Sequence, residues 1–113
     1  MITKLVDAEN EFTDPLFVAR EERFLFECRE YTTAVLTDSL DAVITIQWVL
    51  YDEELSRPAD DDARWTDVEE YNAGSGDISH VSNAGNAWYR VGVKTGDYVQ
   101  GVAELKVQTC RAA

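Results

Sequence analysis

The sequence has one histidine, His80, among its 113 residues. A metal site built on two imidazole ligands is therefore excluded. A His-based catalytic dyad would need a nucleophile and a carboxylate nearby, and "DISHVSN" does supply Asp77, Ser79 and Ser82. The glycine pattern of a nucleophile elbow is absent, however. We expect His80 to be a surface residue, and we expect the protein not to be an enzyme.

Cysteine is also scarce, since Cys28 and Cys110 are the only two and nothing places them at metal-ligand spacing. Cys28 is in phase with Phe24 and Phe26, so we expect a small buried side chain. A disulfide between the two cysteines would need Cα atoms within about 7 Å. The sequence leaves that pairing open.

Basic residues are few: 10 Lys and Arg stand against 22 Asp and Glu, for a net charge of −12 and a pI near 4.3. Such a field repels a phosphate backbone, so nucleic acid is not an expected partner. An anionic membrane surface is disfavoured for the same reason. The charge either keeps the protein soluble at high local concentration or steers it onto a basic partner surface.

Long hydrophobic runs are missing as well. The longest, "AVITIQWVLY" at 42–51, is too short to span a bilayer, and "MITKLVDAENEF" lacks the order of a signal peptide. "GSGD" lacks the lysine and the setting of a phosphate-binding loop, so no cofactor is expected. The sequence predicts a soluble single domain over 1–113, made in the cytoplasm, with enough apolar residues (45%) for its own core.

What the sequence does have is alternation with a period of two residues, which is typical of β-strands. It is clearest at 23–29, 42–50, 88–94 and 101–108, and shorter strand candidates lie at 31–37 and 65–71. We also expect a strand within 14–22. The pattern predicts an all-β antiparallel β-sandwich, either immunoglobulin/fibronectin-like or jelly-roll-like. Residues 1–12 are interpreted as an N-terminal arm.

Turn residues separate these runs. "TGDYVQG" predicts a hairpin loop between 88–94 and 101–108, in which Gly96 takes a positive φ. The range 52–64 is an acidic loop insertion. Its Asp60, Asp61 and Asp62 suggest a calcium site, but the glycine and glutamate of an EF-hand loop are absent at the required positions. A solvated acidic loop is the favoured interpretation.

Two features predict surfaces that contact a partner. The strand at 42–50 is apolar on both faces, with Val43 and Val49 opposite the Ile44 face, which indicates a covered or subunit-facing side. In the predicted hairpin the charged residues share an outer face with Trp88, whereas Tyr89, Val91, Val93, Ala103, Leu105 and Val107 point inward. The candidate interface residues are Val43, Val49, Trp88, Arg90, Lys94, Glu104 and Lys106.

The range 42–108 resembles small virion structural proteins of tailed bacteriophages, which carry a pattern like "vtlQ-s-D-g-tWtdv" followed by "wYRvGvktGdytsG". The matching residues are Gln47, Asp52, Trp65, Thr66, Asp67, Val68, Trp88, Tyr89, Arg90, Gly92, Lys94, Thr95, Gly96, Asp97, Tyr98 and Gly101. The sequence departs from the pattern by inserting the acidic stretch at 60–62, and by having Gln100 before Gly101 where serine is more usual.

The resemblance implies a β-sandwich displayed on the virion without catalysis, as a capsid decoration (cement) protein. Its partners would be the major capsid protein or other virion proteins, and it would form a homo-oligomer, a dimer or a trimer. One alternative is a neck or tail structural protein of the same fold. Another is a carbohydrate-binding module that uses Trp65 and Trp88 as stacking platforms.

Overall fold

A computed structural model describes residues 1–50, 56–73, 78–82 and 86–111, and within 78–82 only the backbone. The regular elements in these ranges are β-strands, which confirms the all-β prediction. The described residues contain no helix long and apolar enough to cross a membrane. In chain order, the strands are β1 (Ile2–Val6), β2 (Glu11–Phe12), β3 (Leu16–Val18), β4 (Glu22–Glu30), β5 (Asp41–Leu50), β6 (Thr66–Asn72), β7 (Ile78–Ser82), β8 (Ala87–Val93), β9 (Tyr98–Gln100) and β10 (Ala103–Arg111).

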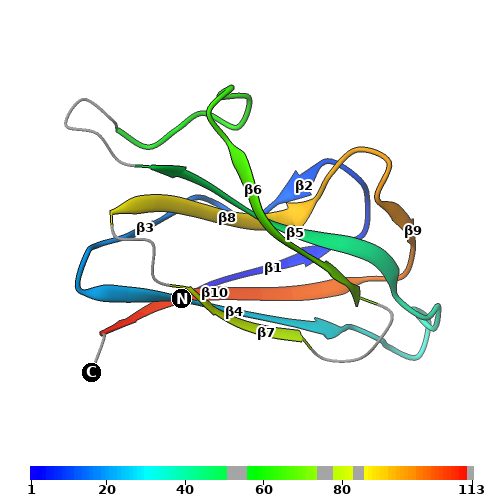
Figure 1. The fold of residues 1–113 in the computed structure, drawn as a ribbon. Coiled ribbons are helices and arrows are strands. Elements are labelled where there is room, and N and C mark those ends of the chain that lie inside the picture. The colour runs from blue at the N-terminus through cyan, green and yellow to red at the C-terminus, as the bar shows by residue number, and fades with distance from the viewer. Residues whose placement is uncertain (51–55, 74–77, 83–85, 112–113) are drawn as a thin grey trace.

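The strands form two antiparallel sheets that face each other as layers (Figure 1). One sheet has four strands in the order β1-β10-β4-β7, and the other is six-stranded with the order β2-β8-β5-β6. In the six-stranded sheet, β3 also pairs with β8 and β9 pairs with the start of β5. The predicted antiparallel sandwich is therefore confirmed.

The pairing between strands is nested from the ends of the chain inward. β1 pairs with β10, β2 and β3 pair with β8, β4 pairs with β7, and β5 pairs with β6. This is the arrangement of a jelly roll, in which one long antiparallel hairpin wraps into two sheets. The nested pairing favours the jelly roll of the two sandwich types that the sequence left open.

The core lies between the two sheets, where every second residue of each long strand points inward. Phe24 stacks on Tyr89 with ring centroids 4.4 Å apart, and the edge of Trp48 meets Tyr89 from β5. All six residues predicted to point inward from 88–94 and 101–108 are buried. Each fully buried side chain of this size contributes roughly 1.5–3 kcal/mol, so the alternation itself drives the pairing of the layers.

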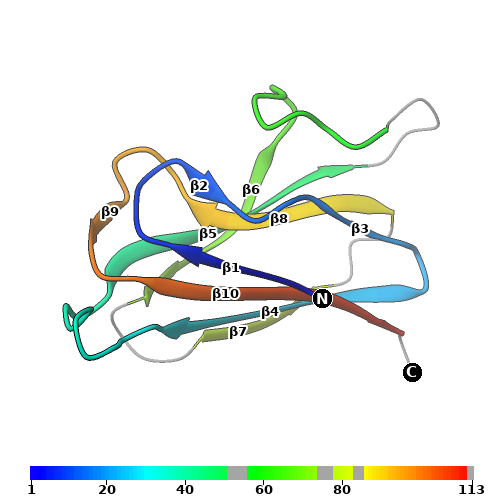
Figure 2. The same ribbon diagram turned by 180° about the vertical axis from the view of Figure 1, so that it is seen from behind.

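The N-terminal segment is part of both sheets, so the prediction of an arm over 1–12 is corrected. β1 lies along β10 at the edge of the four-stranded sheet (Figure 2), and Val6 is buried in the core. The chain then crosses to the other layer, where β2 pairs with β8. Burial of one face of β1 and its backbone ladder hold these residues in place.

Residues 88–108 do not form the predicted hairpin. β8 belongs to the six-stranded sheet and β10 to the four-stranded sheet, and the connection carries β9 along β5. Gly96 (φ 88°) has the predicted positive φ, and Gly101 (φ 85°) has one as well. Packed sheets lie roughly 10 Å apart. The run "TGDYVQG" at 95–101, which contains both glycines, carries the chain across this distance from one sheet to the other.

The range 31–37, predicted as a short strand from its β-branched residues, forms an irregular connection between β4 and β5. The Thr33 hydroxyl accepts hydrogen bonds from the backbone N–H groups of Val35 (3.3 Å) and Leu36 (3.0 Å). The Thr33 N–H also donates to the Leu36 carbonyl (2.9 Å). Threonine here builds a turn through its hydroxyl, which competes with strand formation.

Candidate functional site

Chemistry-bearing side chains gather at several places in the described structure. The first is the outer face of the six-stranded sheet, where β6, β5 and β8 lie side by side. The register places Gln47 of β5 opposite Asp67 of β6 and opposite Arg90 of β8. Strand alternation directs all three side chains away from the core, because the inward positions are taken by residues such as Ile46.

Arg90 is the centre of this outer-face network, and it is 8% exposed. Its Nε donates to Gln47 Oε1 at 2.8 Å, and its Nη1 donates to the Asp60 carbonyl at 2.9 Å. The guanidinium lies between the rings of Phe12 (4.2 Å to the centroid) and Trp65 (4.3 Å). Burial lowers the pKa of Arg90 and the Asp60 carboxylate opposes that shift; arginine stays charged in either case.

The network continues from Arg90 to Lys94. Gln47 Nε2 donates to Asp67 Oδ1 at 2.9 Å, and Lys94 Nζ donates to Asp67 Oδ2 at 2.7 Å and to Glu70 Oε1 at 3.0 Å. The hydrogen bonds that Lys94 and Gln47 donate to Asp67 lower the pKa of Asp67, and the bonds that Lys94 donates to Asp67 and Glu70 raise the pKa of Lys94. The arrangement ties three strands together.

Residues 56–65, which precede β6, lie against this outer face, where the Asp60 carbonyl and the Trp65 ring contact Arg90. Trp65 donates its indole N–H to the Ala59 carbonyl at 2.9 Å, and Pro58 is buried. Figure 1 shows the green segment at 56–65 above the layer that contains β8 and β5. Val49, on the second apolar face of β5, is 2% exposed within the single chain. The apolar second face is therefore covered largely by the protein itself.

This cover corrects two of the candidate interface residues. Val49 and Arg90 are buried inside the chain, and neither offers its side chain to a partner. Val43 is half-buried on the same face. Trp88 is half-buried too, with its ring edge-on to Phe17 of β3 at 5.4 Å between centroids.

The charged candidates lie on opposite layers of the sandwich. Lys94 follows β8 in the six-stranded layer and binds Asp67 and Glu70, as described above. Glu104 and Lys106 lie on the outer face of β10 in the other layer, 3.6 Å apart at their charged atoms. The structure therefore does not bring the four charged residues together as the hairpin prediction had them.

In the acidic stretch at 60–62, the Asp60 carbonyl binds Arg90 and the Asp62 side chain makes local contacts. Asp62 binds the Arg64 side chain at 2.8 Å, and hydrogen bonds from Arg64 lower the pKa of Asp62 to about 2. Among the residues that the structure describes, no group of three His, Cys, Asp or Glu side chains is placed to hold a metal ion. Asp52 and the His80 side chain fall outside the described part of the chain.

The cysteines lie on neighbouring strands and do not pair with each other. Cys28 of β4 is opposite Leu105 and is buried, as predicted. Cys110 of β10 is opposite Arg23, at the other end of the same ladder. No disulfide joins Cys28 to Cys110, which answers the question that the sequence left open.

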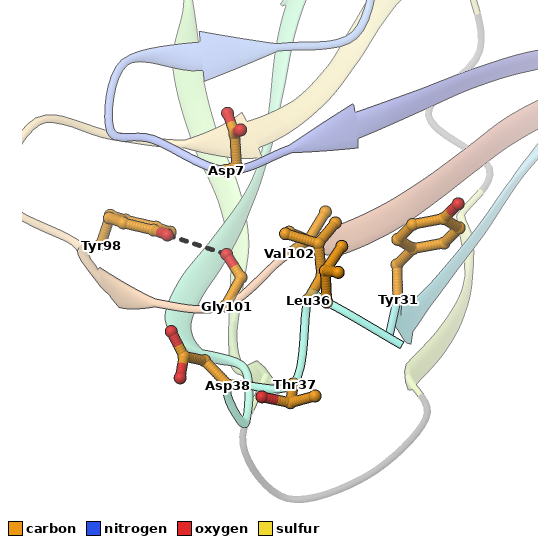
Figure 3. A pocket seen from close by; sticks show the side chains of 9 residues that line it. Asp7, Tyr31, Leu36, Thr37, Asp38, Tyr98, Gly101 and Val102 are labelled. Atoms are coloured by element: carbon orange, nitrogen blue, oxygen red, sulfur yellow. Dashed lines mark hydrogen bonds between the residues drawn. The ribbon is translucent and has the colours of Figure 1, made fainter. Parts of the chain in front are cut away.

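The second place is a pocket of about 220 Å³ at one end of the sandwich (Figure 3), which we call the end pocket. Three segments contribute to it: the β1–β2 turn, the β4–β5 connection, and β9 together with the turn that follows it. Its lining residues are Asp7, Tyr31, Val35, Leu36, Thr37, Asp38, Tyr98, Gly101 and Val102. None of these was a candidate site residue from the sequence.

The walls of the end pocket are fixed by hydrogen bonds. Tyr98 donates its hydroxyl to the Gly101 carbonyl at 2.8 Å, which Figure 3 shows as a dashed line. The Tyr31 N–H donates to the Val102 carbonyl at 2.9 Å, and the Leu40 N–H donates to Glu30 Oε2 at 2.7 Å. Because these hydrogen bonds fix the segments on both sides of the pocket, we expect its shape to change little when a partner binds.

Electrostatically the end pocket is acidic. Burial raises the pKa of the Tyr98 phenol, and Asp7, Asp38 and Glu11 raise that pKa further through their negative charges. No basic side chain belongs to the described residues that line the pocket. The sequence held one signal of this site, the adjacent apolar pair Val35 and Leu36, which we interpreted as part of a strand.

Comparisons of the chain with protein-family models, with curated proteins and with solved structures found no match.

Proposed function

We propose that the protein is a structural protein of a tailed-bacteriophage virion, acting without catalysis as a capsid decoration protein on the shell of the major capsid protein. The observation that carries the proposal is where the resembling residues lie. Gln47, Trp65, Asp67, Arg90 and Lys94 belong to the phage-like pattern and come from three separate stretches of sequence. In the folded chain they meet in the outer-face network.

This convergence matters because residues that match the phage pattern by chance, in separate segments of the sequence, need not contact one another in the folded chain. Arg90 needs the Gln47 oxygen and the Trp65 ring, and Asp67 needs Gln47 and Lys94. Residues that depend on each other in this way are expected to be kept as a set. The resemblance therefore reads as a signature of a shared scaffold.

The fold adds weaker support. Jelly rolls occur in viral capsid and lectin domains, and a fold by itself does not define a function. A carbohydrate-binding module would use the faces of Trp65 and Trp88 to stack on sugars, but both rings already make contacts within the chain. One face of Trp65 covers Arg90, and the ring of Trp88 packs against Phe17.

The proposal is tested by co-sedimentation with shells assembled from the major capsid protein of the phage whose genome encodes this chain. We expect the protein to pellet with expanded shells and to saturate at a fixed number of copies per shell, because lattice junctions repeat. Unexpanded shells are the matched control. The proposal would be wrong if the protein stayed in the supernatant with both kinds of shell. Antibody labelling at the neck or tail of virions would instead support the alternative role as a neck or tail structural protein.

A further inference from the structure

We propose that the end pocket is a docking site for a segment of a partner protein in which a cationic side chain stands beside an apolar one. The pocket's preference for this chemistry stands on its own geometry. Only the naming of the partner as a capsid-shell protein rests on the proposed function.

The apolar part of the argument is the position of Val35 and Leu36, which are 86% and 45% exposed. They sit on a turn that Thr33 fastens through three hydrogen bonds. An ordered turn that holds two neighbouring apolar side chains in water gains nothing for the folded chain alone. Exposed apolar groups at the rim of a hollow are typical of protein contact sites.

The size of the pocket points to a side chain of a protein partner. Pockets that enclose small-molecule ligands measure roughly 300–1,000 Å³, and the end pocket holds about 220 Å³. Gly101 keeps the floor closed, because a Cβ there would lie 2.6 Å from the Leu40 Cα. One side chain of leucine or arginine size suits such a space.

The charge of the occupant follows from complementarity. Asp7 and Asp38 flank the pocket on two sides (Figure 3), and both act on the Tyr98 phenol along with Glu11. The whole chain adds a net charge of −12. A cationic group approaching this end is drawn in, whereas an acidic segment is repelled.

The test uses the full chain, labelled with nitrogen-15, and the peptide acetyl-Gly-Leu-Arg-Leu-Gly-amide as the probe. We expect amide resonances of 31–38 and 98–102 to shift on titration. Binding should weaken about two- to threefold when the ionic strength is raised to about 0.3 M, because exposed charges are then screened. The same peptide with glutamate in place of arginine should produce no shifts there. Shifts of equal size with the glutamate peptide, or shifts confined to other residues, would overturn the inference.

Variants of the pocket residues distinguish specific binding at the end pocket from nonspecific binding of the peptide. We expect Val35→Ser combined with Leu36→Ser to weaken peptide binding about tenfold, as the loss of partly buried apolar contact predicts. Asp38→Asn should weaken it by roughly threefold. The matched controls are Val99→Ser, an exposed apolar residue outside the pocket, and Glu21→Gln, and both should bind as the parent does.

Shell binding distinguishes the two proposals. If the Val35→Ser, Leu36→Ser double variant pellets with expanded shells as the parent does, the decoration role stands and the capsid shell is not the partner that docks at the end pocket. If the peptide binds at the end pocket and no shell binds the parent, the site stands and the role is wrong. Spectra of the variants that match the parent away from 31–38 establish that they are folded.

Discussion

Arg90 carries a full positive charge on a side chain that the protein almost completely encloses. A buried charge is costly unless its donors are satisfied, and here Gln47 and the Asp60 carbonyl accept from it. The rings of Phe12 and Trp65 supply their negative faces on either side. A lysine at this position would keep the charge and lose the planar fork that reaches both acceptors at once.

We therefore expect Arg90→Ala to lower the free energy of unfolding by about 2–3 kcal/mol, because it leaves the buried Gln47 oxygen and the Asp60 carbonyl without their donor. Arg90→Lys should cost at least half as much. Urea denaturation followed by circular dichroism measures both. Arg23→Ala, on an exposed position of β4, is the control and should change stability by less than about 0.5 kcal/mol. Equal effects at the two arginines would show that the network contributes nothing.

At the scale of the element, β8 is the strand on which the six-stranded layer depends. It pairs with β5 on one side and with β2 and β3 on the other. Gly92 faces Phe12 across the β2–β8 ladder, and a Cβ there would clash with the Glu11 carbonyl and lie 2.6 Å from the Phe12 Cα. The missing side chain is what lets Phe12 come close enough to cover Arg90.

We expect Gly92→Ala to destabilise the protein by roughly 2–3 kcal/mol through overpacking of β2 against β8. Gly96→Ala is the matched control. No atom lies within 4 Å of a Cβ at Gly96, so only its positive φ opposes the change, at about 1 kcal/mol. Thermal unfolding of the two variants side by side gives the order. If Gly92→Ala lowered the stability less than Gly96→Ala did, β2 would be able to move away from β8 without a cost in stability, and the overpacking argument would be wrong.

The strands were predictable because the in-and-out alternation is a local property of each segment. Tyr89, Leu105 and Phe26 followed it, and all are buried. The partners of the strands were not predictable in the same way, since β8 and β10 are neighbours in sequence and lie in different layers. Arg90 was correctly placed on the outer face, but its cover comes from Phe12 and Trp65, which are remote in the chain. The end pocket was missed because Val35 has a high strand propensity, and the Thr33 turn outweighs it.

For the whole molecule, two electrostatic effects oppose each other as the pH falls. The net charge of −12 is gradually neutralised, which relieves repulsion among the carboxylates. The folded-state pKa of Asp67 is lowered, so its contribution is present above the unfolded pKa and is lost as the pH falls through the folded pKa. Comparing the parent with an Asp67 variant at each pH separates the contribution of the Asp67 carboxylate from the effect of the overall net charge.

We expect Asp67→Asn to lower the free energy of unfolding by about 0.5–1 kcal/mol at neutral pH, a modest value because the pair with Lys94 is partly exposed. The difference from the parent should shrink toward zero below the folded pKa of Asp67, where the parent's own carboxyl is protonated. Urea titrations at neutral and at acidic pH measure this difference. Asp61→Asn, at an exposed position of the acidic loop, serves as the control and should show little difference throughout. A difference at Asp67 that stays constant with pH would contradict the linkage.

The nested pairing of the strands also sets an order of events during synthesis. β10 lies between β1 and β4, so the four-stranded sheet lacks a central strand until residues 103–111 have left the ribosome. At roughly 5–20 residues per second, β1 waits several seconds for its ladder partner. During that interval the apolar faces of β1 and β4 are uncovered. We therefore expect the nascent chain to need protection from aggregation until β10 is made, and a ribosome stalled before residue 103 to hold an aggregation-prone, incomplete sandwich.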